Sequence, residues 1–222
     1  MKHSRTLTFT ALFIAGSCLA ARTSPAQRSA GTGGGTSAGS EHGEASQGDQ
    51  LSPQDAQMLE LARDAANRIQ QVMDGWIAQR LVSDKQVFSS LYYPIADTNP
   101  QKFTTDWDKL ADRDFQAIEE GLLSRSSDLR FVVVVDRNGY LPTHNKRYSQ
   151  ALTGNLEMDL KNSRTKRIFN DITGLSAARN TRPYLLQNYK RDTGESMKDL
   201  SVPILVGGKH WGAIRFGYMA SK

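Results

Sequence analysis

The hydrophobic pattern of the chain begins with one long helix. The apolar stripe consists of Met58, Ala62, Ala65, Ile69, Val72 and Trp76, which recur at alternating steps of four and three. Ser52 suits the N-cap, Pro53 suits the first helical position, and Asp55 completes a capping-box-like pattern. We expect the helix to run to about Val82. The stripe either packs along its own domain or forms a homodimer seam through residues 58–76.

A mixed pattern of helix and strand follows. Segment 88–103 is predicted to be an aromatic loop, and 105–123 a second helix whose inward side includes Trp107 and Phe115. Phe131 to Val135 are five consecutive apolar residues, which suits a strand covered on both faces. Residues 136–139 have the composition of a tight turn, and a second short strand is expected after it.

The last part of the pattern predicts an antiparallel meander. Residues 160–180 are polar, basic and expected to be partly helical. Three strands are predicted at 184–191, 197–206 and 210–218, separated by Thr193-Gly194 and Gly207-Gly208 as hairpin turns. Helices followed by an antiparallel sheet define an α+β fold class.

The first fifty residues do not share this pattern. Residues 1–20 have a basic start, a short apolar run and small closing residues, which predicts a signal peptide. Ala15 to Cys18 also resembles a lipobox, so lipidation at Cys18 and ordinary cleavage both remain open. Residues 21–50 are rich in Gly, Ser and Ala and predict a flexible linker. We therefore expect a periplasmic or extracytoplasmic domain over 51–222.

Composition narrows the classes of function. The formal net charge of +5 falls to about +3 once the leader is removed, which is too small to indicate nucleic-acid binding. Cys18 is the single cysteine, so no intrachain disulfide is expected. The chain has no Gly-x-Ser-x-Gly, His-Glu-x-x-His or phosphate-loop motif, and we expect no enzyme activity. Glu119 and Glu120 are expected on a solvated helix face.

Four ordered motifs carry a family resemblance. They are DRNGYLPTHN (136–145), NSRTKRIFND (162–171), YLLQNYKRDTGE (184–195) and GGKHWGAIRFGY (207–218). Together with the preceding helices they resemble the PAS-like extracytoplasmic sensor domains called Cache, in particular the sensor domain of bacterial methyl-accepting chemotaxis proteins. The resemblance implies a PAS/Cache-like antiparallel sheet and a role in signal transduction or chemotaxis. The sequence has no signalling hairpin, so the domain either acts through a transmembrane signalling partner or simply captures a ligand.

A run of basic residues indicates the ligand. Eight Lys or Arg residues lie between Lys161 and Arg191, with Asp171 the only acid among them. Arginine suits recognition of carboxylate or phosphate, which predicts a small anionic organic ligand. The predicted lining residues are Tyr140, His144, Arg167, Gln187 and Arg191, with Arg164, Arg182 and Arg215 in reserve.

Several alternatives remain open from the sequence. Strand alternation places Trp211, Ala213 and Arg215 on one face, where Arg215 is either a ligand clamp or the partner of a buried acid, with Asp136 the expected acid. The two histidines of the folded region, His144 and His210, are too few for a zinc site, and one of them could instead ligate haem. A haem-based redox or gas sensor and a ligand-free interaction module are therefore the alternatives to a small-molecule sensor.

Overall fold

The computed structural model describes residues 51–190 and 196–220, which belong to one compact unit spanning Glu41–Lys222. The predicted signal peptide, the linker, Cys18 and Arg191 lie outside the described residues. The helices are α1 (Pro53–Ala78), α2 (Asp84–Val87), α3 (Asp108–Leu123), η1 (Lys146–Tyr148), α4 (Leu156–Asn162) and α5 (Ile172–Ala178). The strands are β1 (Tyr93–Ile95), β2 (Lys102–Thr104), β3 (Leu129–Asp136), β4 (Tyr140–Leu141), β5 (Arg167–Ile168), β6 (Leu185–Lys190), β7 (Ser196–Val206) and β8 (Lys209–Met219).

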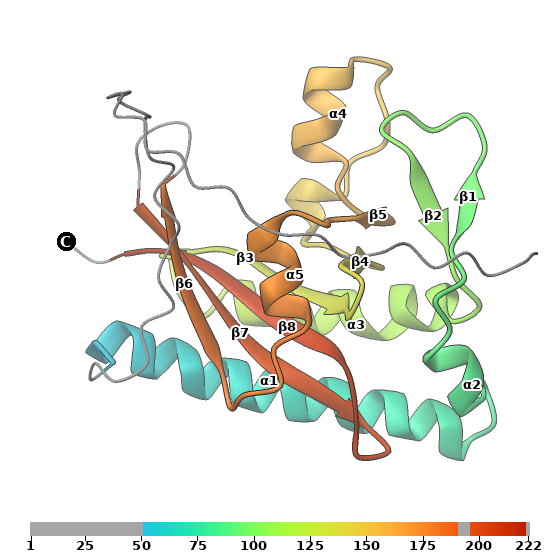
Figure 1. Ribbon diagram of the computed structural model, residues 1–222. Helices are drawn as coiled ribbons and strands as arrows, with labels where there is room; N and C mark the ends of the chain where they lie inside the picture. The colour runs from blue at the N-terminus through green and yellow to red at the C-terminus, as the bar shows by residue number, and fades with distance from the viewer. Residues whose placement is uncertain (1–50, 191–195, 221–222) are drawn as a thin grey trace, which may run out of the picture. The chain divides into compact units, whose positions relative to one another are not determined.

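The main sheet has four antiparallel strands in the order β3-β8-β7-β6 (Figure 1). Two small antiparallel pairs, β1-β2 and β4-β5, lie outside it. The helices together with these antiparallel sheets confirm the α+β class and the long N-terminal helix. The three C-terminal strands were predicted within two residues of their observed bounds. No helix among the described residues is both long enough and apolar enough to cross a membrane.

Helix α1 covers one face of the main sheet. Its start is as predicted, because the Ser52 side chain accepts a hydrogen bond from the Asp55 N–H and Pro53 occupies the first turn. The predicted stripe is buried against β7 and β8, except Val72, which is partly buried. The stripe is therefore the interior seam of this domain, and its buried side chains are not a surface for a second chain. The helix ends at Ala78, before the predicted end at Val82.

The opposite face of the main sheet carries a smaller apolar cluster. It consists of Val133, Val135, Leu141, Ala178 and Ala213, with Phe131 and Phe169 packed against it. Helix α5 contacts β7 and β8, and its C-terminal Ala178 belongs to this cluster (Figure 1). We call this side of the sheet the second face. It also carries the polar side chains considered below.

Two local predictions were wrong, and a third was confirmed. Segment 88–103 is more than a loop, because it contains the antiparallel pair β1-β2. The short strand expected after the tight turn is present as the two-residue β4. Trp211 does not share a face with Arg215. It lies between Gly212 and His210 and has no register partner on β7. Its side chain packs in the larger apolar core between α1 and the main sheet, which we call the α1-side core, edge-on to Trp107 at 5.5 Å. A β-bulge at this position turns its side chain to the other face.

Candidate functional site

Side chains from α3 and from the segment after β4 seal the outer edge of β3. The Val132 N–H donates to Asn145 Oδ1 at 2.8 Å, and the Val134 N–H donates to Glu119 Oε1 at 3.1 Å. The Thr143 hydroxyl also donates to Glu119 Oε1, at 2.9 Å. An edge strand offers such backbone groups to any passing strand, and here buried side chains satisfy them. These bonds fix the segment that carries His144 against the sheet.

The candidate site is a group of cationic and aromatic side chains that border the second face. We call it the arginine–aromatic cluster, and it consists of Phe131, His144, Arg164, Arg167, Phe169 and Arg215. Strand β3 supplies Phe131 and strand β8 supplies Arg215. His144 follows β4, and the other three residues lie in or beside β5. Residues from four parts of the chain therefore meet at one place.

His144 lies at the centre of the positive charge. Its ring is only 4% exposed and packs edge-on to Phe131 and tilted against Tyr148. Burial lowers the pKa of His144 to about 3, and the positive charges of Arg164, Arg147 and Arg215 add to this effect. The imidazole is therefore neutral at neutral pH. Its Nδ1 accepts a hydrogen bond from the Asn145 N–H at 2.8 Å.

Two arginines share one aromatic ring. The Cζ atoms of Arg164 and Arg167 lie 4.7 and 4.8 Å from the centre of the Phe169 ring. Arg167 also donates to the Leu160 carbonyl at 3.1 Å, and its side chain is half-buried. Burial and then the neighbouring charge of Arg164 lower the pKa of Arg167. Stacking on a ring restrains the position of a guanidinium.

Arg215 forms an ion pair within the sheet. Its guanidinium pairs with Asp199 on β7 and lies 5.9 Å from the centre of the Phe131 ring. The acid partner is therefore Asp199, and the expected pairing with Asp136 was wrong. Asp136 instead accepts bonds from the Tyr92 hydroxyl and from the Tyr140 N–H. Ser201, the cross-strand neighbour of Arg215, has a buried hydroxyl with no hydrogen-bond partner among the described residues.

The other predicted lining residues are placed differently. Tyr140 is fully buried in the α1-side core, and its hydroxyl donates to Asp108 at 2.8 Å, so we do not expect it to contact a ligand. Gln187 lies on β6 opposite Asp199, and its amide donates to the Thr173 carbonyl of α5 at 3.1 Å. Arg182 is exposed, and Arg191 lies outside the described residues.

Glu119 was expected on a solvated face, and this prediction was wrong. Its side chain is fully buried, and Oε2 has no hydrogen-bond partner among the described residues. Burial raises the pKa of Glu119 to about 8, although the bonds from Thr143 and Val134 oppose the shift. Glu119 is therefore mainly protonated at neutral pH. The signal was visible in the sequence, because Glu119 lies on the inward stripe of α3 with Phe115 and Leu122.

Because Glu119 is buried, we expect the free energy of unfolding to depend on pH, and we expect Glu119→Gln to remove this part of the pH dependence. Because the pKa of Glu119 is higher in the folded than in the unfolded protein, its protonated form stabilises the fold. This stabilisation is fully present below pH 4.5, the pKa in the unfolded chain, and is lost as the pH rises through about 8, the pKa in the fold. Urea unfolding at about pH 5 and about pH 8 should show the wild type weakening relative to Glu119→Gln by up to about 1.4 kcal/mol per pH unit. Parallel profiles for the two proteins would show that Glu119 is ionised in the fold.

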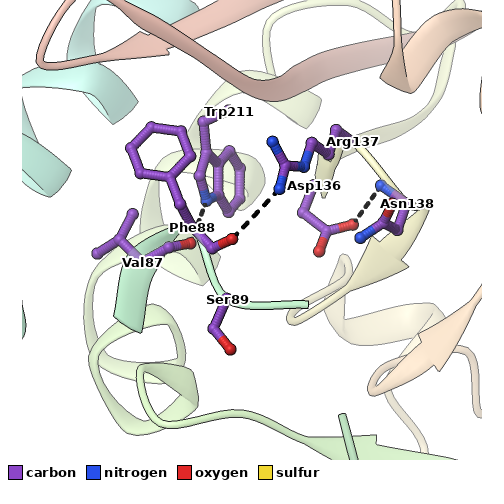
Figure 2. A pocket seen from close by; sticks show the side chains of 7 residues that line it. All are labelled: Val87, Phe88, Ser89, Asp136, Arg137, Asn138 and Trp211. Carbon is purple, nitrogen blue, oxygen red and sulfur yellow. Dashed lines mark hydrogen bonds between the residues drawn. The ribbon is translucent and has the colours of Figure 1, made fainter. Parts of the chain in front are cut away.

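A shallow depression lies at the tight turn after β3. Figure 2 shows its lining residues, which are Val87, Phe88, Ser89, Asp136, Arg137, Asn138 and Trp211. The Trp211 indole donates to the Val87 carbonyl at 3.0 Å, and Arg137 donates to the Phe88 carbonyl at 3.4 Å. Its volume of about 10 Å³ is the space of a single water molecule. This depression is too small for an organic ligand.

Metal binding has no support within the part of the chain that the structure describes. No group of three or more His, Cys, Asp or Glu side chains in residues 51–190 and 196–220 is arranged to hold a metal ion. His144 and His210 are both buried enough for their pKa values to fall below the usual range. What the arrangement offers is charge and hydrogen-bond donors beside aromatic rings.

Comparison with known proteins adds little to this description. No family model matches the chain, and no curated protein matches it. A solved structure described as an extracellular ligand binding receptor from Desulfohalobium retbaense DSM5692 is similar over 73% of this chain, with 17% identity and a TM-score of 0.33. The match covers 25% of that receptor, so this chain spans about a quarter of its length. A likeness of this extent leaves the fold and the site to be argued from the chain's own residues.

Proposed function

We propose that this protein is an extracytoplasmic sensor-type domain that binds a small anionic organic molecule at the arginine–aromatic cluster. The observation that carries the proposal is the convergence of Arg164, Arg167 and Arg215 on the rings of Phe131 and Phe169. A binding site for such a molecule needs apolar contact together with a few fixed polar groups. The cluster supplies both.

The electrostatics of the cluster favour an anion. The pKa of His144 is lowered by burial and then by three arginines, and the pKa of Arg167 is lowered by burial and then by Arg164. Both shifts follow from desolvation together with positive charge that is concentrated in one place. A bound carboxylate would relieve the repulsion among these groups and accept paired bonds from a guanidinium. Asp199 already balances the charge of Arg215.

Neighbouring polar groups extend the proposed site along the second face. The buried Ser201 hydroxyl lies beside Arg215 in the register, and Gln187 lies opposite Asp199 on β6. A buried hydroxyl without a partner is unfavourable, so a ligand atom that bonds to it gains specificity. We propose that Ser201 and Gln187 orient the polar part of the molecule, whereas Phe131 and Phe169 contact its apolar part.

We further propose a route by which binding affects a partner. Strands β7 and β8 carry Asp199, Ser201 and Arg215 on the second face and pack against α1 on the other. A ligand bound on the second face would shift the positions of β7 and β8 and so favour one packing of α1 over another. The altered position of α1 would be detected by a membrane partner in signal transduction or chemotaxis. In this proposal the domain binds its ligand without transforming it, and it holds no resident haem.

A charge-matched ligand panel tests the binding proposal. We expect organic carboxylates to raise the thermal unfolding temperature, because a ligand that binds only the folded state stabilises it, whereas the matched carboxamides should not. The double variant Arg164→Gln/Arg167→Gln should lose the shift, and Arg125→Gln, an exposed arginine just beyond α3, should keep it. Equal shifts with acids and amides, or an unchanged shift in the double variant, would contradict the proposed site.

A further inference from the structure

Helix α4 buries one polar side chain and exposes its three apolar ones. Leu156, Met158 and Leu160 are 46%, 50% and 42% exposed, and they are three of the eight large exposed hydrophobic side chains among the described residues. Asp159, in contrast, is only 1% exposed. A surface helix of a globular domain has the opposite arrangement.

Hydrogen bonds fix this orientation of α4. The Asp159 carboxylate accepts bonds from the Thr153 N–H at 2.9 Å and from the Gly154 N–H at 3.0 Å. Asn155 caps the first turn by accepting the Met158 N–H, and Arg167 donates to the Leu160 carbonyl. Rotating the helix to bury its leucines would break the Asp159 bonds. The hydrogen bonds of α4 therefore hold its apolar side chains at the surface.

The charge beside these apolar residues is mainly positive. Helix η1 contacts α4 and carries the exposed Lys146 and Arg147, and α4 itself carries the exposed Lys161. The exposed acid on α4 is Glu157, because Asp159 is buried and hydrogen-bonded. Leu156 and Leu160 are four residues apart and share one side of α4, whereas Met158 lies on the opposite side. We call Lys146, Arg147, Leu156, Leu160 and Lys161 the α4 patch.

We propose that the α4 patch docks on an anionic membrane surface. Apolar side chains flanked by Lys and Arg suit the headgroup region, where the apolar groups enter the acyl boundary and the cations meet anionic lipids. The charge argues for lipid over a second copy of this chain, because two positive patches would repel each other. A lipid on Cys18, one of the two processing routes left open by the sequence, would tether the domain to a membrane through the predicted 30-residue linker, and even weak docking would then be favoured. This inference does not depend on the ligand site.

Vesicle co-flotation of residues 41–222, the unit that contains the whole described core, tests the proposal. We expect binding to phosphatidylcholine vesicles that contain about one-third phosphatidylglycerol, and much weaker binding to phosphatidylcholine alone. Leu156→Ser/Leu160→Ser should weaken binding roughly tenfold or more, since it removes the apolar contact. Lys161→Gln should weaken it about fivefold on the anionic vesicles only.

A matched control distinguishes binding through the α4 patch from nonspecific hydrophobic binding. Leu91 is 64% exposed and follows α2, which lies away from α4 (Figure 1). Leu91→Ser should leave vesicle binding unchanged. The proposal is overturned by absence of binding to anionic vesicles, by full binding of the double variant, or by an equal loss in Leu91→Ser. A dimer in sedimentation that Leu156→Ser/Leu160→Ser dissociates would also overturn it, because the patch would then be a protein interface.

Discussion

Asp55→Ala is expected to lower the free energy of unfolding by about 3–5 kcal/mol, because it breaks a buried ion pair. The Asp55 carboxylate joins α1 to the sheet. Lys198 Nζ lies 2.7 and 2.8 Å from its two oxygens, and the Tyr218 hydroxyl donates to it at 2.6 Å. Removing the carboxylate leaves a nearly buried ammonium and a buried hydroxyl without their acceptor. Urea unfolding at neutral pH measures the loss.

A control on the same helix shows whether the loss is specific. Asp64 is exposed on α1 and lies 3.9 Å from Arg68, so Asp64→Ala should change stability by less than about 0.5 kcal/mol. Burial alone would raise the pKa of Asp55, but bonds from Lys198, Ser52 and Tyr218 lower it below the usual 3.8. Its contribution is therefore present above about pH 4 and lost as the pH falls further. Equal stability of Asp55→Ala and Asp64→Ala would contradict this account.

Arg215→Ala is expected to destabilise the fold by a similar amount, about 3–5 kcal/mol. The side chain of Asp199 is only 1% exposed, and the variant would leave this charge buried beside an apolar cluster. Replacing both partners, as in Asp199→Leu/Arg215→Met, should recover most of the loss, because no buried charge then remains. Unfolding free energies of the three proteins check this.

The outcome for Arg215 bears on the site. If Arg215→Ala were as stable as the wild type, the guanidinium would contribute nothing to the fold, and its position in the cluster would point to ligand contact alone. We expect instead that Arg215 stabilises the sheet and that Arg164 and Arg167 provide most of the ligand affinity. Both of these lie outside the main sheet, on the segment around β5.

Local signals in the sequence predicted much of the fold. The cap at Ser52 and the 58–76 stripe predicted α1, and Gly207-Gly208 predicted the β7–β8 turn, where both glycines have positive φ. The β1-β2 pair was missed because each strand has three residues and Pro94 lies within β1. Such short strands have no periodicity to detect.

The ion pair of the site could not be predicted because it depends on a bulge. Counting back from the β7–β8 turn in uninterrupted register would place Leu200 opposite Arg215, with Asp199 on the other face. The register shift between Ile204 and Leu205 moves Ser201 opposite Arg215 and brings Asp199 to the same face. One extra residue, Trp211, therefore both completes the α1-side core and creates the polar group of the second face.

Native mass spectrometry of the purified protein, compared with the denatured mass, tests directly whether the arginine–aromatic cluster holds a small organic anion. We expect a small excess mass that is lost on denaturation in the wild type and in Arg125→Gln, and that is absent from Arg164→Gln/Arg167→Gln while that variant remains folded. An excess equal to haem, an excess that persists in the double variant, or no excess in the wild type would contradict the claim that the arginine–aromatic cluster binds a small organic anion.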